Sequence, residues 1–407
     1  MNTVLIISYS PLHSDPRILR QIQALKDNYK ILTIGNTSVN NDDIVHYNTS
    51  EPPRPIHKRT LLQKIRRRLI LYIWLIRNYI WLIRNYNGYY SIMLARKLNF
   101  YYILKHRIET PDVIIANDWT GLYLASTLKT KYSWQAKIYF DAHEYAPKEI
   151  DSSFRWRLLM QPVITNALKK CKLDINIMST VCDGIAREYE RFFGFPNSFV
   201  RVVTNAAEYN SSLKPTAIGM RAEGGMIRLI HHGGAMKIRR LELMINMMNY
   251  LDPDKYELTF MLVKSDPEYY GYLTKISRTY KNIRFIEPVS FSEIINTLNN
   301  YDIGIFLLLP DIFNYKYALP NKLFEYIQAR LAIAIGPSIE MVKIVERYNL
   351  GIYSEDFFPE SLAKRIAQIT PEKIMEYKKN ADKYAKELSA EENINMIRSI
   401  VAELAGD

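Results

Sequence analysis

Residues 227–234 read Ile-Arg-Leu-Ile-His-His-Gly-Gly, an apolar run that ends in two histidines and two glycines. The run Ile227–His231, bounded by glycine and followed by a helical pattern over Leu241–Tyr250, is typical of a buried strand in a parallel sheet. Further runs of the same texture follow at helix-length intervals: Glu257–Val263, Ile283–Ile286, Ile303–Leu309, Leu331–Ile335 and Gly351–Tyr353. The second half of the chain therefore predicts a doubly wound domain built of βαβ units.

The first half of the chain shows the same alternation. Its apolar, β-branched runs are Val4–Ser8, Ile31–Ile34, Val113–Ala116, Lys137–Phe140, Ile175–Met178 and Val200–Val203. Between the halves, Asn210–Gly225 has no periodicity and contains a Ser-Ser and a Gly-Gly pair, which indicates a linker. The tail Pro371–Leu404 carries Glu, Lys, Ala and Ile at helical spacing. We therefore expect an N-terminal Rossmann-like domain over 1–210, a C-terminal one over 226–370, and helices over 371–407 that return toward the first domain.

Length and composition agree with a two-domain globular protein. The chain has 407 residues, 48% of them hydrophobic and 24% charged, which is too long for one compact core and unlike a disordered chain. The apolar run at the N-terminus is too short for a secretory signal. Cys171 and Cys182 are the two cysteines, so no disulfide framework or Cys-x-x-Cys metal pair is expected. These features favour a cytoplasmic protein.

The positive charge is concentrated in one segment. Between Arg54 and Thr110 there are thirteen Lys and Arg residues against one acid, Glu109, an excess equal to the net charge of +12 for the whole chain. The remainder of the chain is therefore electrically balanced. A charge confined to one segment, 54–110, indicates a single docking surface.

Within that segment lies a tandem heptad. Ile73–Tyr79 reads Ile-Trp-Leu-Ile-Arg-Asn-Tyr, and Ile80–Tyr86 repeats it. Because seven residues are almost two helical turns, both copies present the same face. Trp74 and Trp81 would share one edge of a helix with these polar residues: Gln63, Arg66, Arg67, Arg77, Asn78, Arg84 and Asn85.

Tryptophan and arginine on one helical edge favour the headgroup region of a membrane. Leu69–Ile76 is uncharged for only eight residues, which argues against a bilayer span. We therefore predict that 61–86 is an amphipathic helix that lies on anionic lipid. The alternative is that its apolar face packs on the first sheet and its arginines are merely solvated.

Four motifs occur in an informative order. Ser14–Arg17 (Ser-Asp-Pro-Arg) follows the first strand, and Asp141–Glu144 (Asp-Ala-His-Glu) follows another. His232–Gly234 precedes a basic stretch with Arg239 and Glu242, and Pro320-Asn-Lys-Leu-Phe-Glu-Tyr326 begins a helical pattern. From Ser8 to about Glu355 the chain resembles the retaining glycosyltransferases of family four. The resemblance implies the α/β GT-B fold, in which two facing Rossmann-like domains enclose a cleft.

The second-domain motifs suit a nucleotide diphosphate. A Gly233-Gly234 turn leading from a strand into a helix would let backbone amides approach a pyrophosphate. By the resemblance, Arg239 and Lys322 would neutralise the leaving diphosphate, and Glu325 would accept hydrogen bonds from the ribose. Asn321 belongs to the same donor-binding helix start. The family often has a glutamate eight positions before Glu325, and here that position is Tyr317, which leaves the identity of the sugar and retention of configuration open.

The candidate catalytic residues lie in the first half. His143, inside Asp-Ala-His-Glu, would orient the transferred sugar, and Asp118 follows a predicted strand at the edge where ligands bind in parallel sheets. His231 and His232 are not expected to form a metal site, because adjacent strand residues face opposite ways. We expect no metal and no cofactor beyond the nucleotide-sugar co-substrate, for which a UDP-sugar is the first expectation.

These features together predict a glycosyltransferase. Its donor would be a nucleotide-sugar and its acceptor a saccharide, lipid-linked because of the basic helix, at the inner face of the cell membrane in polysaccharide or glycolipid assembly. A nucleotide-sugar 2-epimerase of related fold is the alternative enzyme. A nucleic-acid-binding module is the alternative from another class, but the aromatic residues of 61–86 are embedded in Leu/Ile-rich sequence and are not spaced as stacking platforms. We therefore expect no nucleic-acid partner.

Overall fold

The computed structural model describes residues 1–39, 41, 43–49, 66, 103, 107–218 and 225–407. The predicted membrane helix 61–86 lies outside the described residues, apart from Arg66. The chain divides into two compact units. The first comprises Met1–Ala142, Leu159–Met178 and Ile400–Asp407, and the second comprises His143–Leu158 and Ser179–Ser399.

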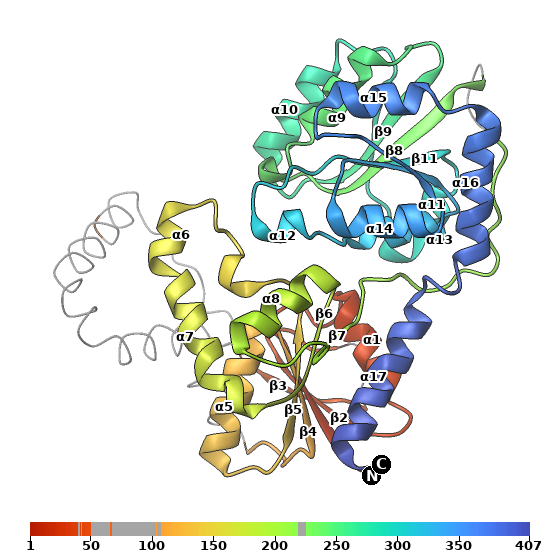
Figure 1. Ribbon diagram of the computed structural model, residues 1–407. Coiled ribbons are helices and arrows are strands. Elements are labelled where there is room, and N and C mark those ends of the chain that lie inside the picture. Colours follow the sequence, from red (N-terminus) through yellow and green to blue (C-terminus); the bar gives the residue numbers. More distant parts are fainter. Residues whose placement is uncertain (40, 42, 50–65, 67–102, 104–106, 219–224) are drawn as a thin grey trace. The chain divides into compact units, whose positions relative to one another are not determined.

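The first sheet has seven strands in the order β3-β2-β1-β4-β5-β6-β7 (Figure 1). Their bounds are β1 Thr3–Ile7, β2 Lys30–Gly35, β3 Val45–Asn48, β4 Val113–Asn117, β5 Lys137–Ala142, β6 Ile175–Thr180 and β7 Val200–Val202. β1 pairs in parallel with both β2 and β4. Six strands coincide with runs that the sequence predicts. The sequence does not predict β3, because this short edge strand is exposed or half-buried and lacks an apolar run.

The second sheet has six strands in the order β10-β9-β8-β11-β12-β13. Their bounds are β8 Ile227–Gly234, β9 Tyr256–Val263, β10 Ile283–Ile286, β11 Ile303–Phe306, β12 Ala332–Ile335 and β13 Gly351–Tyr353. Every one coincides with a predicted run, and all neighbouring strands of this sheet pair in parallel. Both sheets are therefore doubly wound, as the sequence predicts.

Helices connect and cover the strands. Their bounds are α1 Pro16–Leu25, α5 Asp118–Tyr132, α6 Phe154–Leu159, α7 Gln161–Cys171, α8 Asp183–Phe193, α9 Glu242–Met247, α10 Pro267–Ser277, α11 Ile294–Leu298, α12 Phe313–Lys316, α13 Asn321–Gln328, α14 Ile339–Arg347, α15 Pro359–Ala367, α16 Pro371–Tyr384 and α17 Ala390–Ala405. In the second unit α9, α10 and α15 cover one face of the sheet, and α11, α13 and α14 cover the other (Figure 1). In the described part of the chain, none of these helices has the length and apolarity needed to cross a bilayer.

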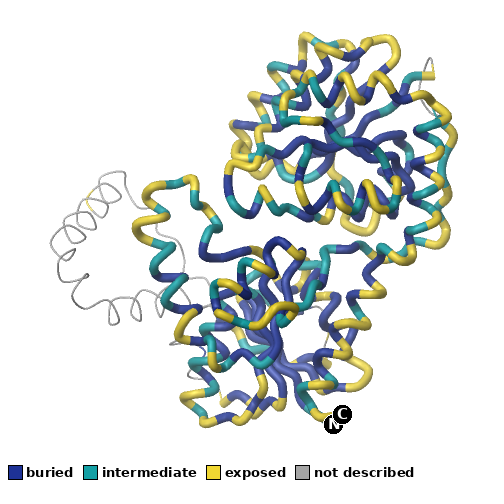
Figure 2. The backbone as a smooth tube through the Cα atoms, in the orientation of Figure 1, coloured by how far each residue is buried: buried dark blue, intermediate teal, exposed yellow. Residues whose placement is uncertain are grey.

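The strands form the cores of both units. Every residue of β1 and β4 is buried, and Figure 2 shows the strands of both sheets among the most buried parts of the chain. Strands covered on both faces need continuous Val, Ile and Leu runs, which is why the sequence signal is strong here. Cys171 and Cys182 are buried free thiols, in agreement with the prediction of no disulfide.

A buried polar network closes the first βα turn. The Asp15 side chain caps α1 by accepting a hydrogen bond from the Arg17 amide at 2.9 Å. The Arg17 side chain donates two hydrogen bonds to Asp141 at the end of β5, from Nε to Oδ2 at 2.7 Å and from a terminal nitrogen to Oδ1 at 2.5 Å. Gln21 Nε2 donates to Asp141 Oδ2 and to Asn117 Oδ1, both at 2.8 Å. Burial lowers the pKa of Arg17, but the charge and hydrogen bonds of Asp141 outweigh it and raise the pKa overall. The motifs Ser14–Arg17 and Asp141–Glu144 thus share a structural ion pair.

We predict that Arg17→Met destabilises the first unit by about 3–5 kcal/mol, because it leaves a buried carboxylate without its cation. Lys30→Met is the matched control, since Lys30 pairs with Glu109 at 2.7 Å but both side chains are half exposed. The control should cost less than about 1 kcal/mol. Urea unfolding followed by circular dichroism measures both, and equal losses for the two variants would contradict the assignment of Arg17–Asp141 as the structural pair.

Candidate functional site

The candidate site lies at the switch point of the second sheet. Strand order reverses between β8 and β11, and ligands bind beyond the carboxyl ends of the strands at such a reversal. β8 ends at Gly234 and β11 ends at Phe306. α13 begins nearby at Asn321, directly after Pro320. The predicted donor residues therefore come from the elements that border this reversal.

Lys322 lies directly against the end of β8. A Cβ atom placed on Gly233 would be 2.7 Å from Lys322 Nζ and 3.8 Å from an Arg239 guanidinium nitrogen. Gly233 also has a φ of +123°, a conformation that side-chain-bearing residues rarely adopt. The backbone conformation of Gly233 therefore favours glycine, and a Cβ there would also force the end of the Lys322 side chain to move. Gly234 is similarly crowded, since a Cβ there would lie 2.9 Å from Ser265 Oγ.

The Lys322 ammonium is buried without full neutralisation. Only 8% of the residue is exposed, and its Nζ lies 5.3 Å from the centroid of the Phe306 ring. Burial and, to a lesser degree, the nearby charge of Arg239 lower the pKa of Lys322, Glu325 opposes them, and the resulting pKa is about 8. A cation pair held at low dielectric favours the arrival of an anion.

Arg239 occupies a different local structure from the one predicted. It ends a short 3₁₀ helix, Lys237–Arg239, and α9 begins only at Glu242. The sequence-based interpretation that Gly233-Gly234 turns directly into a helix is therefore wrong, because both glycines still belong to β8. Arg239 lies beside Tyr315, whose pKa is raised by burial while the nearby Arg239 opposes the rise. The sequence gives no signal for this proximity, because Tyr315 belongs to α12, which is distant in the chain from Arg239.

Glu325 is buried beside His232. The carboxylate Oε2 lies 3.2 Å from His232 Nε2, close enough for a hydrogen bond, yet the ring nitrogen makes no well-aligned bond. Burial lowers the pKa of His232, and Glu325 only partly offsets this. Because desolvation is the largest effect, the contact is better described as a neutral imidazole next to a carboxylate than as an ion pair. A ligand hydroxyl that donates to Glu325 would give this carboxylate a better-aligned hydrogen bond than His232 does.

The two adjacent histidines diverge, as alternation along a strand requires. His231 stacks on Phe306 with ring centroids 5.6 Å apart, and its Nδ1 lies 3.1 Å from the Ile305 carbonyl. His232 instead meets Tyr326 edge-on at 5.5 Å. In the ranges that the structure describes, no group of three or more His, Cys, Asp or Glu side chains is arranged to hold a metal ion.

The remaining predicted residues take separate places. Asn321 is the exposed first residue of α13. Tyr317, which stands where the family often has glutamate, packs its ring on Gly184 and lies 5.0 Å from the Phe313 ring. Its ring is therefore committed to packing.

His143 and Asp118 belong to different units. His143 is half-buried, and the next two residues hold Asn314: Glu144 Oε2 accepts at 3.1 Å, and the Tyr145 amide donates at 2.9 Å. Asp118 opens α5 next to the reversal between β1 and β4, with a φ of +56°. The other described non-glycine residues with positive φ lie at helix ends or in a turn, so Asp118 is distinctive in being strained at a helix start.

No family model and no curated protein matches this sequence. Solved structures match along nearly the whole chain. Sucrose-phosphate synthase from Thermosynechococcus elongatus is 10% identical, with a TM-score of 0.70 and 99% of each chain covered. WaaG, a glycosyltransferase involved in lipopolysaccharide biosynthesis, is 11% identical, with a TM-score of 0.62, 98% of this chain and 99% of that chain covered. HepE from Anabaena, solved in complex with UDP, is 10% identical, with a TM-score of 0.63 and 99% of each chain covered.

At these identities the likeness establishes the fold. This chain has the GT-B fold. The fold that the sequence predicts is therefore confirmed, including its two doubly wound GT-B domains. The roles of the site residues remain predictions that rest on the geometry described above.

We predict that Lys322→Met makes the protein more stable at pH 7, by on the order of 1–3 kcal/mol. The pKa of Lys322 is about 8 in the folded protein, against an ordinary 10.5. Below pH 8 both states carry the proton, and the folded state bears the full cost of burying the charge. Between pH 8 and 10.5 only the unfolded state stays protonated, so this cost disappears as the pH rises. The advantage of the variant should shrink over that window.

Urea unfolding at a series of pH values measures this difference. Lys316→Met, which removes an exposed lysine from the end of α12, is the control and should differ little from the parent at any pH. An advantage of Lys322→Met that is absent, or that grows above pH 8, would show that Lys322 is not an unneutralised buried cation.

Proposed function

We propose that this protein is a glycosyltransferase that moves a sugar from a nucleotide-sugar, first of all a UDP-sugar, to a saccharide acceptor. The observation that carries the proposal is that two cations, Lys322 and Arg239, lie next to Gly233 at the switch point of the second sheet. HepE, which shares this fold, was solved with UDP and with UDP and glucose. A nucleoside diphosphate supplies the negative charge that these cations lack.

The donor would be held mainly by the second unit. Lys322 and Arg239 would bind the diphosphate next to Gly233, where no side chain keeps the phosphates away from the backbone. Glu325 would accept hydrogen bonds from the ribose hydroxyls, replacing its poorly aligned contact with His232. Because Lys322 is buried, its charge is worth more to a phosphate than an exposed lysine would be.

The reaction breaks the bond between the anomeric carbon and the diphosphate oxygen and forms one from the anomeric carbon to an acceptor oxygen. The acceptor hydroxyl loses its proton, and the nucleoside diphosphate leaves with the bonding electron pair. Lys322 and Arg239 stabilise the charge that develops on that diphosphate. We propose that they do so without a divalent metal. The resemblance to family four implies retention of anomeric configuration, although Tyr317 stands where the family often has a glutamate.

His143 and Asp118 are the proposed catalytic residues. His143 would orient the transferred sugar. Asp118 stands at the ligand-binding edge of the first sheet, and its strained backbone is a cost typical of functional positions. Its proposed place is with the acceptor.

The donor site is tested by alanine variants. Arg239→Ala, Lys322→Ala and Glu325→Ala should each weaken UDP binding about tenfold or more, because a charge-assisted contact contributes on the order of 1.5–3 kcal/mol. Lys316→Ala, at the exposed end of α12, is the control and should bind UDP as the parent does. Isothermal calorimetry at pH 7 measures the affinities, and three variants with parental affinity would overturn the assignment.

The same preparation gives the activity test. Products from a panel of UDP-, GDP- and TDP-sugars with extracted lipid-linked acceptors are identified by mass spectrometry, with and without EDTA. Transfer should survive EDTA. Loss of transfer that magnesium or manganese restores would contradict the metal-independent mechanism, and an epimerised free sugar nucleotide formed without acceptor would favour the 2-epimerase alternative.

We further propose that the acceptor is lipid-linked and that the enzyme works at the inner face of the cell membrane, in polysaccharide or glycolipid assembly. The support is the basic segment 61–86, which contains the tryptophan-bearing repeat and six of the thirteen Lys and Arg residues of segment 54–110. Each basic residue near an anionic surface contributes about 1 kcal/mol. Indole rings at the headgroup level would add a contribution that salt does not screen.

Vesicle sedimentation tests this membrane proposal. A variant with Arg66, Arg67, Arg77 and Arg84 replaced by Gln should be released from anionic vesicles and keep parental UDP affinity, and salt should partly mimic the change. A variant that sediments as the parent does would show that the arginines are only solvated. Loss of affinity for single-stranded nucleic acid would instead support the nucleic-acid alternative.

A further inference from the structure

The helix that carries the donor residues ends in an unusual way. After α13, the Leu331 amide donates to the Tyr326 carbonyl at 3.0 Å, the closing bond of a Schellman motif. The residue that this motif places in the left-handed conformation is Arg330, with a φ of +61°. Glycine is the usual residue at such a position, because a Cβ is disfavoured there. The left-handed backbone conformation of Arg330 is therefore energetically unfavourable compared with a glycine at the same position.

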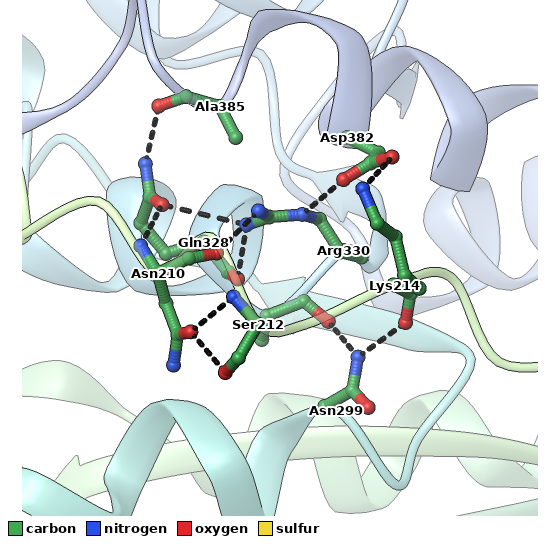
Figure 3. A network of polar contacts seen from close by, with 9 residues as sticks. Asn210, Ser212, Lys214, Asn299, Gln328, Arg330, Asp382 and Ala385 are labelled. Carbon is green, nitrogen blue, oxygen red and sulfur yellow. Dashed lines mark hydrogen bonds and ion pairs between the residues drawn. The ribbon is translucent and has the colours of Figure 1, made fainter.

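The side chain of Arg330 adds a second cost and its compensation. The residue is completely buried, and an unpaired guanidinium would be strongly unfavourable there. Figure 3 shows how it is satisfied: Nε donates to Asp382 Oδ1 at 2.8 Å, and its terminal nitrogens donate to the Gln328 carbonyl at 2.5 Å and the Asn210 carbonyl at 2.7 Å. One side chain thus joins the last turn of α13 to α16 and to residue 210.

Gln328, the last residue of α13, reinforces the same connection. Its Nε2 donates to the Ala385 carbonyl at 2.6 Å, and its Oε1 accepts from the Asn210 amide at 3.3 Å (Figure 3). Asp382 Oδ2 also lies 3.5 Å from Nζ of the exposed Lys214. The end of α13 is therefore connected to α16 and to residue 210 by a largely buried network in which each named group has a partner. Such a network favours a single position of the helix end.

We propose that Arg330 is a positioning residue for the donor site, which holds α13 so that Lys322 reaches Gly233. This inference rests on the proposed function of α13 in nucleotide binding. Arg330 lies eight residues beyond Lys322, about 12 Å along a rigid helix, so a shift at one end moves the other. The ammonium of Lys322 lies close to the Gly233 backbone, 2.7 Å from where a Cβ would stand. A displacement of α13 would change this close approach.

The chain contains a matched control position. Asn349 also follows a helix, α14, with a φ of +49°, and it also contacts α16: its Nδ2 donates to Glu376 at 2.9 Å, and its carbonyl accepts from Asn380 at 2.8 Å. α14 carries none of the proposed donor residues. Asn349→Gly therefore changes the same kind of backbone position, with contacts to the same helix, away from the site.

The experiment measures UDP affinity by calorimetry at a temperature where circular dichroism shows every variant to be folded. Arg330→Met, which keeps the length of the side chain but removes its charge and donors, should bind UDP about tenfold more weakly. Arg330→Lys should recover part of the loss, and Asn349→Gly should bind as the parent does. If Arg330→Met does not fold, Asp382→Asn, which removes the ionic partner of Arg330, provides the same test.

A double-mutant cycle separates positioning from a general structural effect. If Arg330 acts through Lys322, the loss caused by Arg330→Met should largely vanish in a Lys322→Ala background. Parental UDP affinity in Arg330→Met, or losses that simply add in the double variant, would overturn the inference while leaving the donor site intact. A parent protein that binds neither UDP nor GDP would contradict the proposed function, and this inference with it.

Discussion

The close approach of the Lys322 ammonium to the backbone of Gly233 is the constraint on which the site depends. It requires a residue without Cβ at 233, with a φ that other residues rarely adopt. It also requires that β8 reach as far as Gly234 and that α13 begin just after Pro320. The end of β8, the start of α13 and the Lys322 ammonium therefore meet at one place.

The buried cations show how similar residues serve different purposes. Asp141 neutralises Arg17, and the pKa of Arg17 is raised in spite of burial. Lys322 lacks such compensation, so burial and Arg239 lower its pKa to about 8. The first arrangement is that of a structural pair. The second leaves the folded protein at pH 7 with an unfavourable charge that an anionic ligand would neutralise, a cost typical of functional sites.

Arg330 represents a third use of a buried cation. Its charge is satisfied by Asp382 and by backbone carbonyls, yet its left-handed backbone costs on the order of 1 kcal/mol or more. A glycine would avoid both the strain and the buried charge. What arginine adds is a fixed attachment of α13 to α16 and residue 210. The polar network in the second unit is thus connected along α13 to the proposed diphosphate site.

The apolar pattern of the chain was enough to predict nearly all strands of the two sheets. Runs such as Val113–Ala116 and Ile303–Leu309 predicted twelve strands, because a strand buried on both faces must be apolar throughout. The sequence did not predict β3, because this edge strand is not buried on both faces and need not be apolar. The sequence also singled out Gly233, Arg239, Lys322 and Glu325 as candidates for a donor site, through the resemblance of their motifs to family four and because their residue types suit a diphosphate and a ribose.

The contacts among those residues became apparent from the folded structure and could not be predicted from the chain. It placed Arg239 on a 3₁₀ helix, because β8 continues through both glycines. It brought His232 to Glu325 and Tyr315 to Arg239, contacts between residues distant in the chain. It also set the pKa of Lys322, which depends on burial and on the position of a neighbouring charge. Periodicity reports which face of an element is buried, whereas contacts between elements depend on how they pack, and no local pattern encodes that.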